Sequence, residues 1–194
     1  LVTLKSLWFK ASDINSILVP IKLKIMKNII LTIVFLFAAI SCKAQFNYLN
    51  STEVFDGIKF NNVSLGDIMI ASGDLTKMKA FFGSDILETP NNTGFYIGKE
   101  LSNDNIVFSF EDETDTGNNY YLTSITVLDS SVIVNVKGLS VKIGDHKSKF
   151  RGFIFNTYKE DNSFNFTDKD TGSISLSFKI DNDDKVSEIE YISF

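Results

Sequence analysis

A single cysteine, Cys42, stands at the end of an apolar run in this chain of 194 residues. The run from Ile29 to Ile40 follows Met26 and Lys27, and small residues follow it, which is the three-zone pattern of an export signal. Its 12 residues are too few for a membrane-spanning helix, which needs about 20. We therefore interpret residues 26–45 as an export signal peptide and not as a permanent anchor.

Two cleavage sites compete within this signal. The residues Ala39-Ile40-Ser41-Cys42 resemble a bacterial lipobox, which predicts cleavage before Cys42 and lipidation of its thiol. The residues Cys42-Lys43-Ala44 also fit an A-x-A type site, which would start the mature chain at Gln45. The first reading predicts a lipoprotein of the cell envelope, in the outer membrane or periplasm, whose membrane contact is the lipid anchor alone. The second predicts a secreted domain.

Residues 1–25 precede the first methionine, and we interpret them as an upstream, non-native extension. Residues 46–194 then form a single domain of ordinary size. This part keeps 13 of the 19 Lys and Arg residues and 23 of the 24 Asp and Glu residues, a net charge of −10. Such a surface repels phosphate backbones, so nucleic acid is excluded as a partner. Without cysteine, this part offers neither disulfides nor thiol catalysis.

No sequence motif groups the side chains that could catalyse a reaction or bind a metal ion. His146 is the only histidine, and no nucleophile or zinc motif accompanies it. Asp168 and Asp170 begin like a calcium loop, but Gly172 stands where a third oxygen ligand is needed. The acidic residues 111–115 have no ligand spacing. The sequence therefore predicts a non-enzymatic protein with no catalytic residue, no cofactor and no metal site, and with solvated hairpin tips.

Alternation of apolar and polar residues predicts antiparallel strands with one buried and one solvated face. The clearest case is Ile174–Ile180, where Ser175, Ser177 and Lys179 separate apolar residues. Further strands are expected at 106–110, 122–127, 132–136, 164–166 and 186–191. Segments 115–119, 168–172 and 181–184 are rich in Asp, Asn, Thr and Gly, which predicts hairpin loops between the strands.

Two segments of the chain carry a similar order of elements. Segments 63–83 and 141–154 each contain a Gly-Asp pair, with Asp74 and Asp145 as expected helix caps. Apolar stripes predict helices of two to three turns, the first ending at Gly83. The stripes are Met78, Phe81 and Phe82 in the first copy and Phe150, Phe153 and Ile154 in the second. Two strands follow each helix: 106–110 matches 174–178, and 122–127 matches 186–191.

This order predicts an α+β fold with an internal duplication, at about 58–128 and 132–194. Each unit would be a short helix packed on antiparallel strands, and the two units would form one curved antiparallel sheet. Common composition is the alternative explanation for the likeness.

The elements that carry a family resemblance are Ile143-Gly144-Asp145, the Phe-rich helix after it and the hairpin strands ending at Tyr191. Over residues 60–194 this pattern resembles the tandem α/β repeat of the β-lactamase inhibitor protein family. It also resembles the related single-unit SmpA/OmlA outer-membrane lipoproteins. The resemblance implies short helices on one face of a curved antiparallel sheet, with the other face free for a protein partner.

These observations favour a bacterial envelope protein that binds a protein partner through the exposed face of its sheet. The side chains expected on that face are Ser109, Ser175, Ser177, Lys179, Glu188 and Glu190. The alternative is a small-molecule or calcium-binding envelope protein, which would use apolar space between helix and sheet or the acidic loops.

Overall fold

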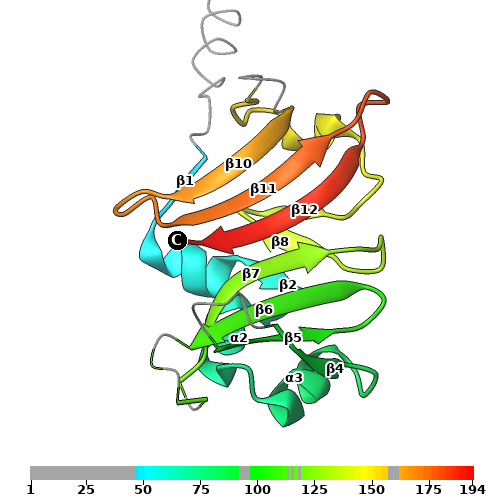
Figure 1. Ribbon diagram of the computed structural model, residues 1–194. Coiled ribbons are helices and arrows are strands. Elements are labelled where there is room, and N and C mark those ends of the chain that lie inside the picture. The colour runs from blue at the N-terminus through cyan, green and yellow to red at the C-terminus, as the bar shows by residue number, and fades with distance from the viewer. Residues whose placement is uncertain (1–46, 92–96, 113, 115, 118, 157–161) are drawn as a thin grey trace, which may run out of the picture. The chain divides into compact units, whose positions relative to one another are not determined.

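The computed structural model describes residues 47–91, 97–112, 114, 116–117, 119–156 and 162–194 (Figure 1). The predicted upstream extension and the signal peptide, with Cys42 and Gln45, lie outside the described residues.

An eight-stranded sheet dominates the described residues, in the order β1-β10-β11-β12-β7-β6-β5-β4. β1 runs parallel to β10, and every other neighbouring pair in this sheet is antiparallel. The strands are β1 (Tyr48–Leu49), β4 (Leu87–Pro90), β5 (Ile97–Ser102), β6 (Ile106–Asp112), β7 (Tyr121–Val127), β10 (Ser163–Asp168), β11 (Ile174–Ile180) and β12 (Val186–Ser193).

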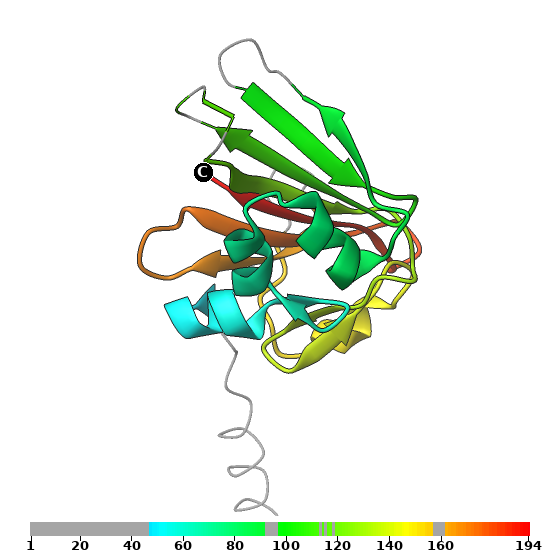
Figure 2. The same ribbon diagram turned by 90° about the horizontal axis from the view of Figure 1, so that it is seen from below.

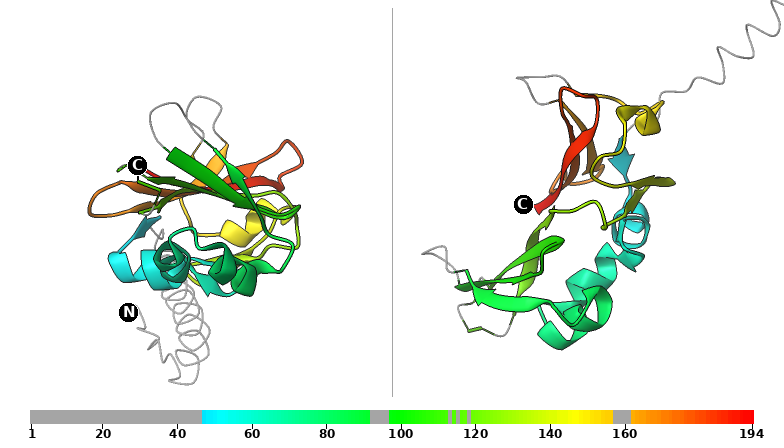
Figure 3. Two further views of the ribbon diagram at one scale, coloured as in Figure 1. Left: turned by 60° about the horizontal axis from the view of Figure 1, so that its bottom comes forward. Right: turned by 90° about the vertical axis from the view of Figure 1, so that its right-hand side faces the viewer.

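The helices and a four-stranded sheet lie together on one side of the large sheet, as Figures 2 and 3 show. The small sheet has the order β3-β2-β8-β9. Its strands are β2 (Lys59–Phe60), β3 (Val63–Ser64), β8 (Val134–Val136) and β9 (Leu139–Val141). The helices are the π-helix η1 (Glu53–Gly57), the α-helices α2 (Leu65–Ala71) and α3 (Leu75–Phe82), and the 3-10 helix η2 (Lys147–Phe150).

The core fills the space between these two layers. Along β11, Ile174, Leu176, Phe178 and Ile180 are buried while the residues between them are not. β6 buries Ile106, Phe108 and Phe110 in the same rhythm. They meet Leu65, Ile68 and Met78 from the helices in one apolar cluster. The predicted alternation, the predicted strands and the α+β class with mainly antiparallel sheet are confirmed.

The first predicted helix is confirmed, with both of its ends. The Asp74 carboxylate accepts hydrogen bonds from the main-chain N–H groups of Thr76 and Lys77, which the first turn of α3 leaves without helical partners. Both hydrogen bonds lower the pKa of Asp74, and the one from the Lys77 N–H has the larger effect. Gly83 ends the helix in a conformation with φ of +116°, which favours glycine.

The second predicted helix is wrong in length and in its cap. Only Lys147–Phe150 is helical, because Gly152 takes a φ of +97° and turns the chain away. Phe150 and Phe153 pack on β10 from this short turn, with ring centroids 4.2 Å from Phe164 and 5.2 Å from Phe166. The residues with helical spacing therefore belong to an irregular segment, and the rings of Phe150 and Phe153 contact different residues of β10.

His146, and not Asp145, caps this turn. Its Nδ1 accepts the main-chain N–H of Ser148 at 3.1 Å. Asp145 instead accepts from the Lys142 main chain at 2.8 Å and from Lys149 Nζ at 2.7 Å. Burial acts to raise the pKa of Asp145, but the hydrogen bonds from Lys149 and Lys142 outweigh it and lower the pKa below its ordinary value.

Other local expectations also change. Gly66 and Asp67, the first Gly-Asp pair of segment 63–83, lie in the first turn of α2 and not before α3 alone. Ser64 caps that helix: its Oγ accepts the Asp67 N–H and donates to the Asp67 carboxylate at 2.6 Å. β4 and β5, which the sequence pattern did not indicate, extend the large sheet beyond β6.

Structural features of the first half of the domain recur in the second half. The loops of hairpins β2–β3 and β8–β9 each contain two residues with positive φ, Asn61-Asn62 and Lys137-Gly138, as a type I′ turn requires. In the large sheet, β5-β6-β7 and β10-β11-β12 are both meanders of three strands, and they join at the antiparallel β7–β12 pair.

The core packing predicts that substitutions at neighbouring positions of β11 differ strongly in their effect on the free energy of unfolding. Phe178 is fully buried, and its ring centroid lies 5.1 Å from that of Phe150 and 5.9 Å from that of Phe166. Phe178→Ala should lower the free energy of unfolding by about 3–5 kcal/mol, because the cavity cannot collapse under a sheet. Ser177→Ala, on the other face, should change it by less than about 0.5 kcal/mol. Urea denaturation of both variants measures this, and equal losses would contradict the assignment of faces.

Candidate functional site

The face of the large sheet that the helices leave uncovered is the first candidate surface. Figure 1 looks onto this face, with α2 and the small sheet behind it. Strand register aligns its side chains in rows across seven strands, from β10 to β4. We call these the hydroxyl rows. The first is Thr167, Ser175, Ile192, Ser124, Ser109, Glu100 and Thr89. The second is Asn165, Ser177, Glu190, Thr126, Val107, Ser102 and Leu87.

All six residues expected on the exposed face lie on it. Ser109 and Ser175 are in the first hydroxyl row, and Ser177 and Glu190 are in the second. Lys179 and Glu188 are opposite each other, and their charged groups form an ion pair of 2.6 Å. Because both side chains are nearly half exposed, this pair contributes little to stability.

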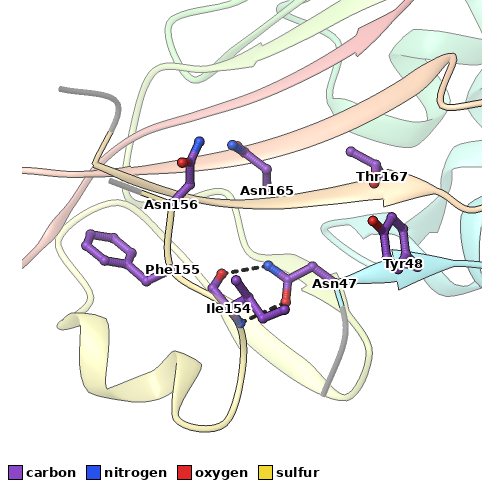
Figure 4. A pocket seen from close by; sticks show the side chains of 7 residues that line it. All are labelled: Asn47, Tyr48, Ile154, Phe155, Asn156, Asn165 and Thr167. Atoms are coloured by element: carbon purple, nitrogen blue, oxygen red, sulfur yellow. Dashed lines mark hydrogen bonds between the residues drawn. The ribbon is translucent and has the colours of Figure 1, made fainter. Parts of the chain in front are cut away.

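A pocket of about 410 Å³ opens at the β1–β10 edge of this face (Figure 4). Asn165 and Thr167, which begin the two hydroxyl rows, form one wall. Tyr48 lies beside Thr167 on the neighbouring strand and is 54% exposed. Ile154 and Phe155 form the opposite wall, Asn156 lies at one end, where it pairs with Ser163 of β10, and Asn47 joins the two walls. The volume falls in the usual range of small-molecule sites, about 300–1,000 Å³.

Asn47 acts as a clamp that fixes the shape of this pocket. Its side-chain NH₂ donates to the main-chain carbonyl of Ile154 at 2.8 Å, and its side-chain oxygen accepts the main-chain N–H of Ile154 at 3.0 Å. Its own carbonyl accepts the N–H of Thr167 at 3.0 Å. One residue thereby ties the start of β1 to β10 and to a segment 107 residues away.

The edge of β10 is covered on both sides of Asn165. Ser163 donates its main-chain N–H to Asn156, and Thr167 and Lys169 donate theirs to Asn47 and Leu49. Alternation along a strand points the N–H of Asn165 to the same edge, between these two contacts. In the part of the chain that the structure describes, neither this N–H nor the Asn165 side-chain amide has a partner. The pocket therefore opens beside amide groups that a ligand could bind.

The acidic loops use their carboxylates locally. Asp168 accepts from the hydroxyl of Thr171 and from the N–H groups of Asp170 and Thr171. The Thr171 hydroxyl contributes most to lowering the pKa of Asp168. Across the described segments, no three His, Cys, Asp or Glu side chains lie close enough together to hold a metal ion. Of the acidic residues 111–115, Glu113 and Asp115 lie outside the described residues.

Two further residues were considered in the sequence, His146, for which no catalytic role was predicted, and Cys42, the predicted lipidation site. His146 is exposed and caps η2, as described above, so its observed role is local. Cys42, the predicted lipidation site, lies outside the described residues, and its modification stays a prediction. Sequence reasoning missed the pocket, because its walls come from three segments with no local motif in common.

The comparisons with known proteins identify no family for this chain. No protein-family model matches it, and no curated protein matches it. Among solved structures it is similar to a cysteine-rich secretory protein from Staphylococcus aureus, with 14% sequence identity and a TM-score of 0.31. The match covers 61% of this chain and 43% of that protein, so the chain spans less than half of its length. No helix among the described residues has the length and apolar character needed to span a membrane.

Because of its hydrogen bonds to Ile154, we expect Asn47 to contribute more to the free energy of unfolding than an ordinary residue at the edge of the sheet. Asn47→Ala should lower the free energy of unfolding by about 1–2 kcal/mol, since it removes two hydrogen bonds of about 0.5–1.5 kcal/mol each. Asn47→Asp keeps the acceptor for the Ile154 N–H but sets a carboxylate oxygen against the Ile154 carbonyl oxygen, so it should also destabilise the protein. Urea denaturation compares the variants, and an Asn47→Ala protein as stable as the wild type would contradict the clamp.

Proposed function

We propose that this protein is a non-enzymatic protein-binding module of the bacterial cell envelope. The observation that carries the proposal is the helix-free face with its hydroxyl rows. Its side chains are short and mostly uncharged, so a partner can approach without displacing long, flexible groups, whose immobilisation costs binding energy. Seven strands span roughly 29 Å, and a seven-residue strand is about 23 Å long. That footprint approaches the ~800 Å² that one partner contributes to a standard interface.

The charge of this face suggests the chemistry of the partner. Glu100 and Glu190 lie within the hydroxyl rows, and Lys179 is neutralised by Glu188. The domain as a whole is acidic, with the net charge of −10 given above for residues 46–194. A partner with a weakly basic, flat surface would complement this face and would be attracted from a distance.

We also infer that the domain arose by internal duplication, with units at about 58–128 and 132–194. The order of the strands supports this, because β5-β6-β7 and β10-β11-β12 are both three-stranded antiparallel meanders, joined at the β7–β12 pair. The recurring type I′ turns are further support.

The β-bulges give a third line of support and correct the alignment of the units. The pairing of β6 with β7 shifts between Ser109 and Phe110, where Thr123 of β7 is the extra residue. The pairing of β11 with β12 shifts in the same way between Lys179 and Ile180, where Ser187 of β12 is the extra residue. When the two units are aligned at these register shifts, Ile106 of β6 corresponds to Leu176 of β11. The sequence pattern had aligned Ile106 with Ile174. The proposed tandem repeat agrees in the order of its elements with the β-lactamase inhibitor protein family and the SmpA/OmlA lipoproteins. The proposed resemblance rests on this order alone.

We propose that Cys42 anchors this domain through lipid, with secretion from Gln45 as the alternative. The support is the lipobox-like sequence around the single cysteine. Small-molecule binding is the second candidate function, and the pocket at the β1–β10 edge favours it. The carboxylates of Asp168 and Asp181 bond within their own turns and that of Asp184 pairs with Lys147, so the acidic loops add nothing to a calcium role.

Anchoring predicts a definite mass and location. Protein purified from the membrane fraction should begin at Cys42 and carry the mass of two or three acyl chains, by intact mass spectrometry. Cys42→Ala should abolish the acyl mass and move the protein to the soluble fraction. A wild-type chain that begins at Gln45 without acyl groups would contradict the anchor and favour secretion.

Binding through the open face predicts that one bulky charge at its centre is disruptive. Ser124→Arg should weaken capture of an envelope partner at least about tenfold, since the side chain cannot be buried unpaired. Thr76→Arg, on the exposed side of α3, makes the same chemical change on the helix side and should leave capture unchanged. Crosslinking in envelope extract followed by affinity capture compares the three proteins. Equal capture by both variants, or no specific capture by the wild type, would contradict this function.

A further inference from the structure

We propose that the pocket at the β1–β10 edge binds a neutral saccharide. This inference rests on the second candidate function, small-molecule binding, and names its ligand class. The pocket shares Asn165 and Thr167 with the hydroxyl rows, but its ligand differs in class from the protein partner. It depends on the chemistry of the seven lining residues, which are Asn47, Tyr48, Ile154, Phe155, Asn156, Asn165 and Thr167.

None of the lining side chains carries a charge. In an acidic domain this is a local exception, and it selects against ionic ligands, whose desolvation would find no opposite charge here. A neutral ligand has no charge to desolvate in such a pocket, and its hydroxyl groups need only hydrogen-bond partners. Carbohydrates without acidic or amino groups meet this requirement.

The polar groups of the pocket suit hydroxyl groups. An Asn side chain offers two N–H donors and a carbonyl acceptor, and a Thr hydroxyl both donates and accepts. A sugar hydroxyl can engage both functions at once. Figure 4 shows the amides of Asn156 and Asn165 side by side at one end of the pocket. The Asn165 amide and the Thr167 hydroxyl have no hydrogen-bond partner within the described residues, so both can serve a ligand.

Aromatic rings supply the complementary apolar contacts. Tyr48 is 54% exposed at the other end of the pocket, and Phe155 forms part of the opposite wall. The Phe155 ring is held in place by Phe164, at a centroid distance of 4.8 Å. The C–H face of a pyranose ring is apolar and can cover an exposed aromatic ring, while its hydroxyls reach the amides at the rim.

The geometry disfavours the main competing ligand, an extended peptide. Peptides commonly bind a sheet by adding a strand to its edge. Here the β10 edge is already paired by Asn156 on one side of Asn165 and by Asn47 and Leu49 on the other. A gap of a single residue remains, which cannot hold a strand but can hold one or two sugar rings. The Asn47 clamp keeps the gap open and fixed in shape, so little ordering is required on binding.

Titration of the purified mature protein with maltose, cellobiose and N,N′-diacetylchitobiose tests the proposal, by calorimetry and by ligand-observed NMR. At least one disaccharide should bind with a Kd on the order of 1 mM or tighter. Asn165→Ala and Tyr48→Ala should each weaken binding at least about tenfold. Tyr121→Ala, which removes an exposed tyrosine on β7 outside the pocket, should bind as the wild type does.

Circular dichroism and thermal melting of each variant distinguish loss of binding from loss of fold. If Tyr48→Ala unfolds, the affinity of Asn165→Ala alone tests the proposal. Failure of all three disaccharides to bind would overturn the proposal. So would binding that neither substitution affects, or equal binding of the charged probes citrate and spermidine. None of these outcomes bears on the Ser124→Arg capture experiment, so the two proposals fail separately.

Discussion

Burial of one face of the eight-stranded sheet is the interaction on which the rest of this structure depends. Phe108, Phe178 and Tyr191 stand on that face, and all are fully buried beneath the helices and the small sheet. A shift of one of these strands by one residue would turn the buried side chains of that strand out to water. The apolar core therefore fixes the register, and the register fixes the hydroxyl rows on the opposite face. The candidate interaction surface is a consequence of the core.

The β7–β12 pair joins the two halves of the sheet under the same constraint. Ile125 and Ile189 are buried on the core side of this pair, while Thr126 and Glu190 face each other on the open side. Both meanders bury one face against the same layer of helices and small sheet (Figure 2), so one packing arrangement serves both halves of the large sheet. The helices are free to differ, as α3 and η2 do, because each has only to cover its own part of the sheet.

The sequence predicted what depends on local pattern. The strand Ile174–Ile180 and the helix capped by Asp74 follow from alternation and capping chemistry, and both are confirmed. The second helix was mispredicted, because Phe150, Phe153 and Ile154 have helical spacing but pack on the sheet individually or face solvent. β4 escaped notice because all four of its residues are exposed, so its sequence carries no apolar alternation. The pocket rests on the contact between Asn47 and Ile154, and no local pattern indicates a pairing across 107 residues.

Hydroxyl-radical footprinting of the protein in its native envelope tests most directly whether the open face is the interaction surface. Ile192 and Val107 report from the hydroxyl rows, and Ile70 and Phe81 report from the helix side, where both are exposed. The account predicts that the envelope protects Ile192 and Val107 relative to the purified protein, while Ile70 and Phe81 react equally in both. Protection of Ile70 and Phe81, with Ile192 and Val107 unchanged, would contradict it.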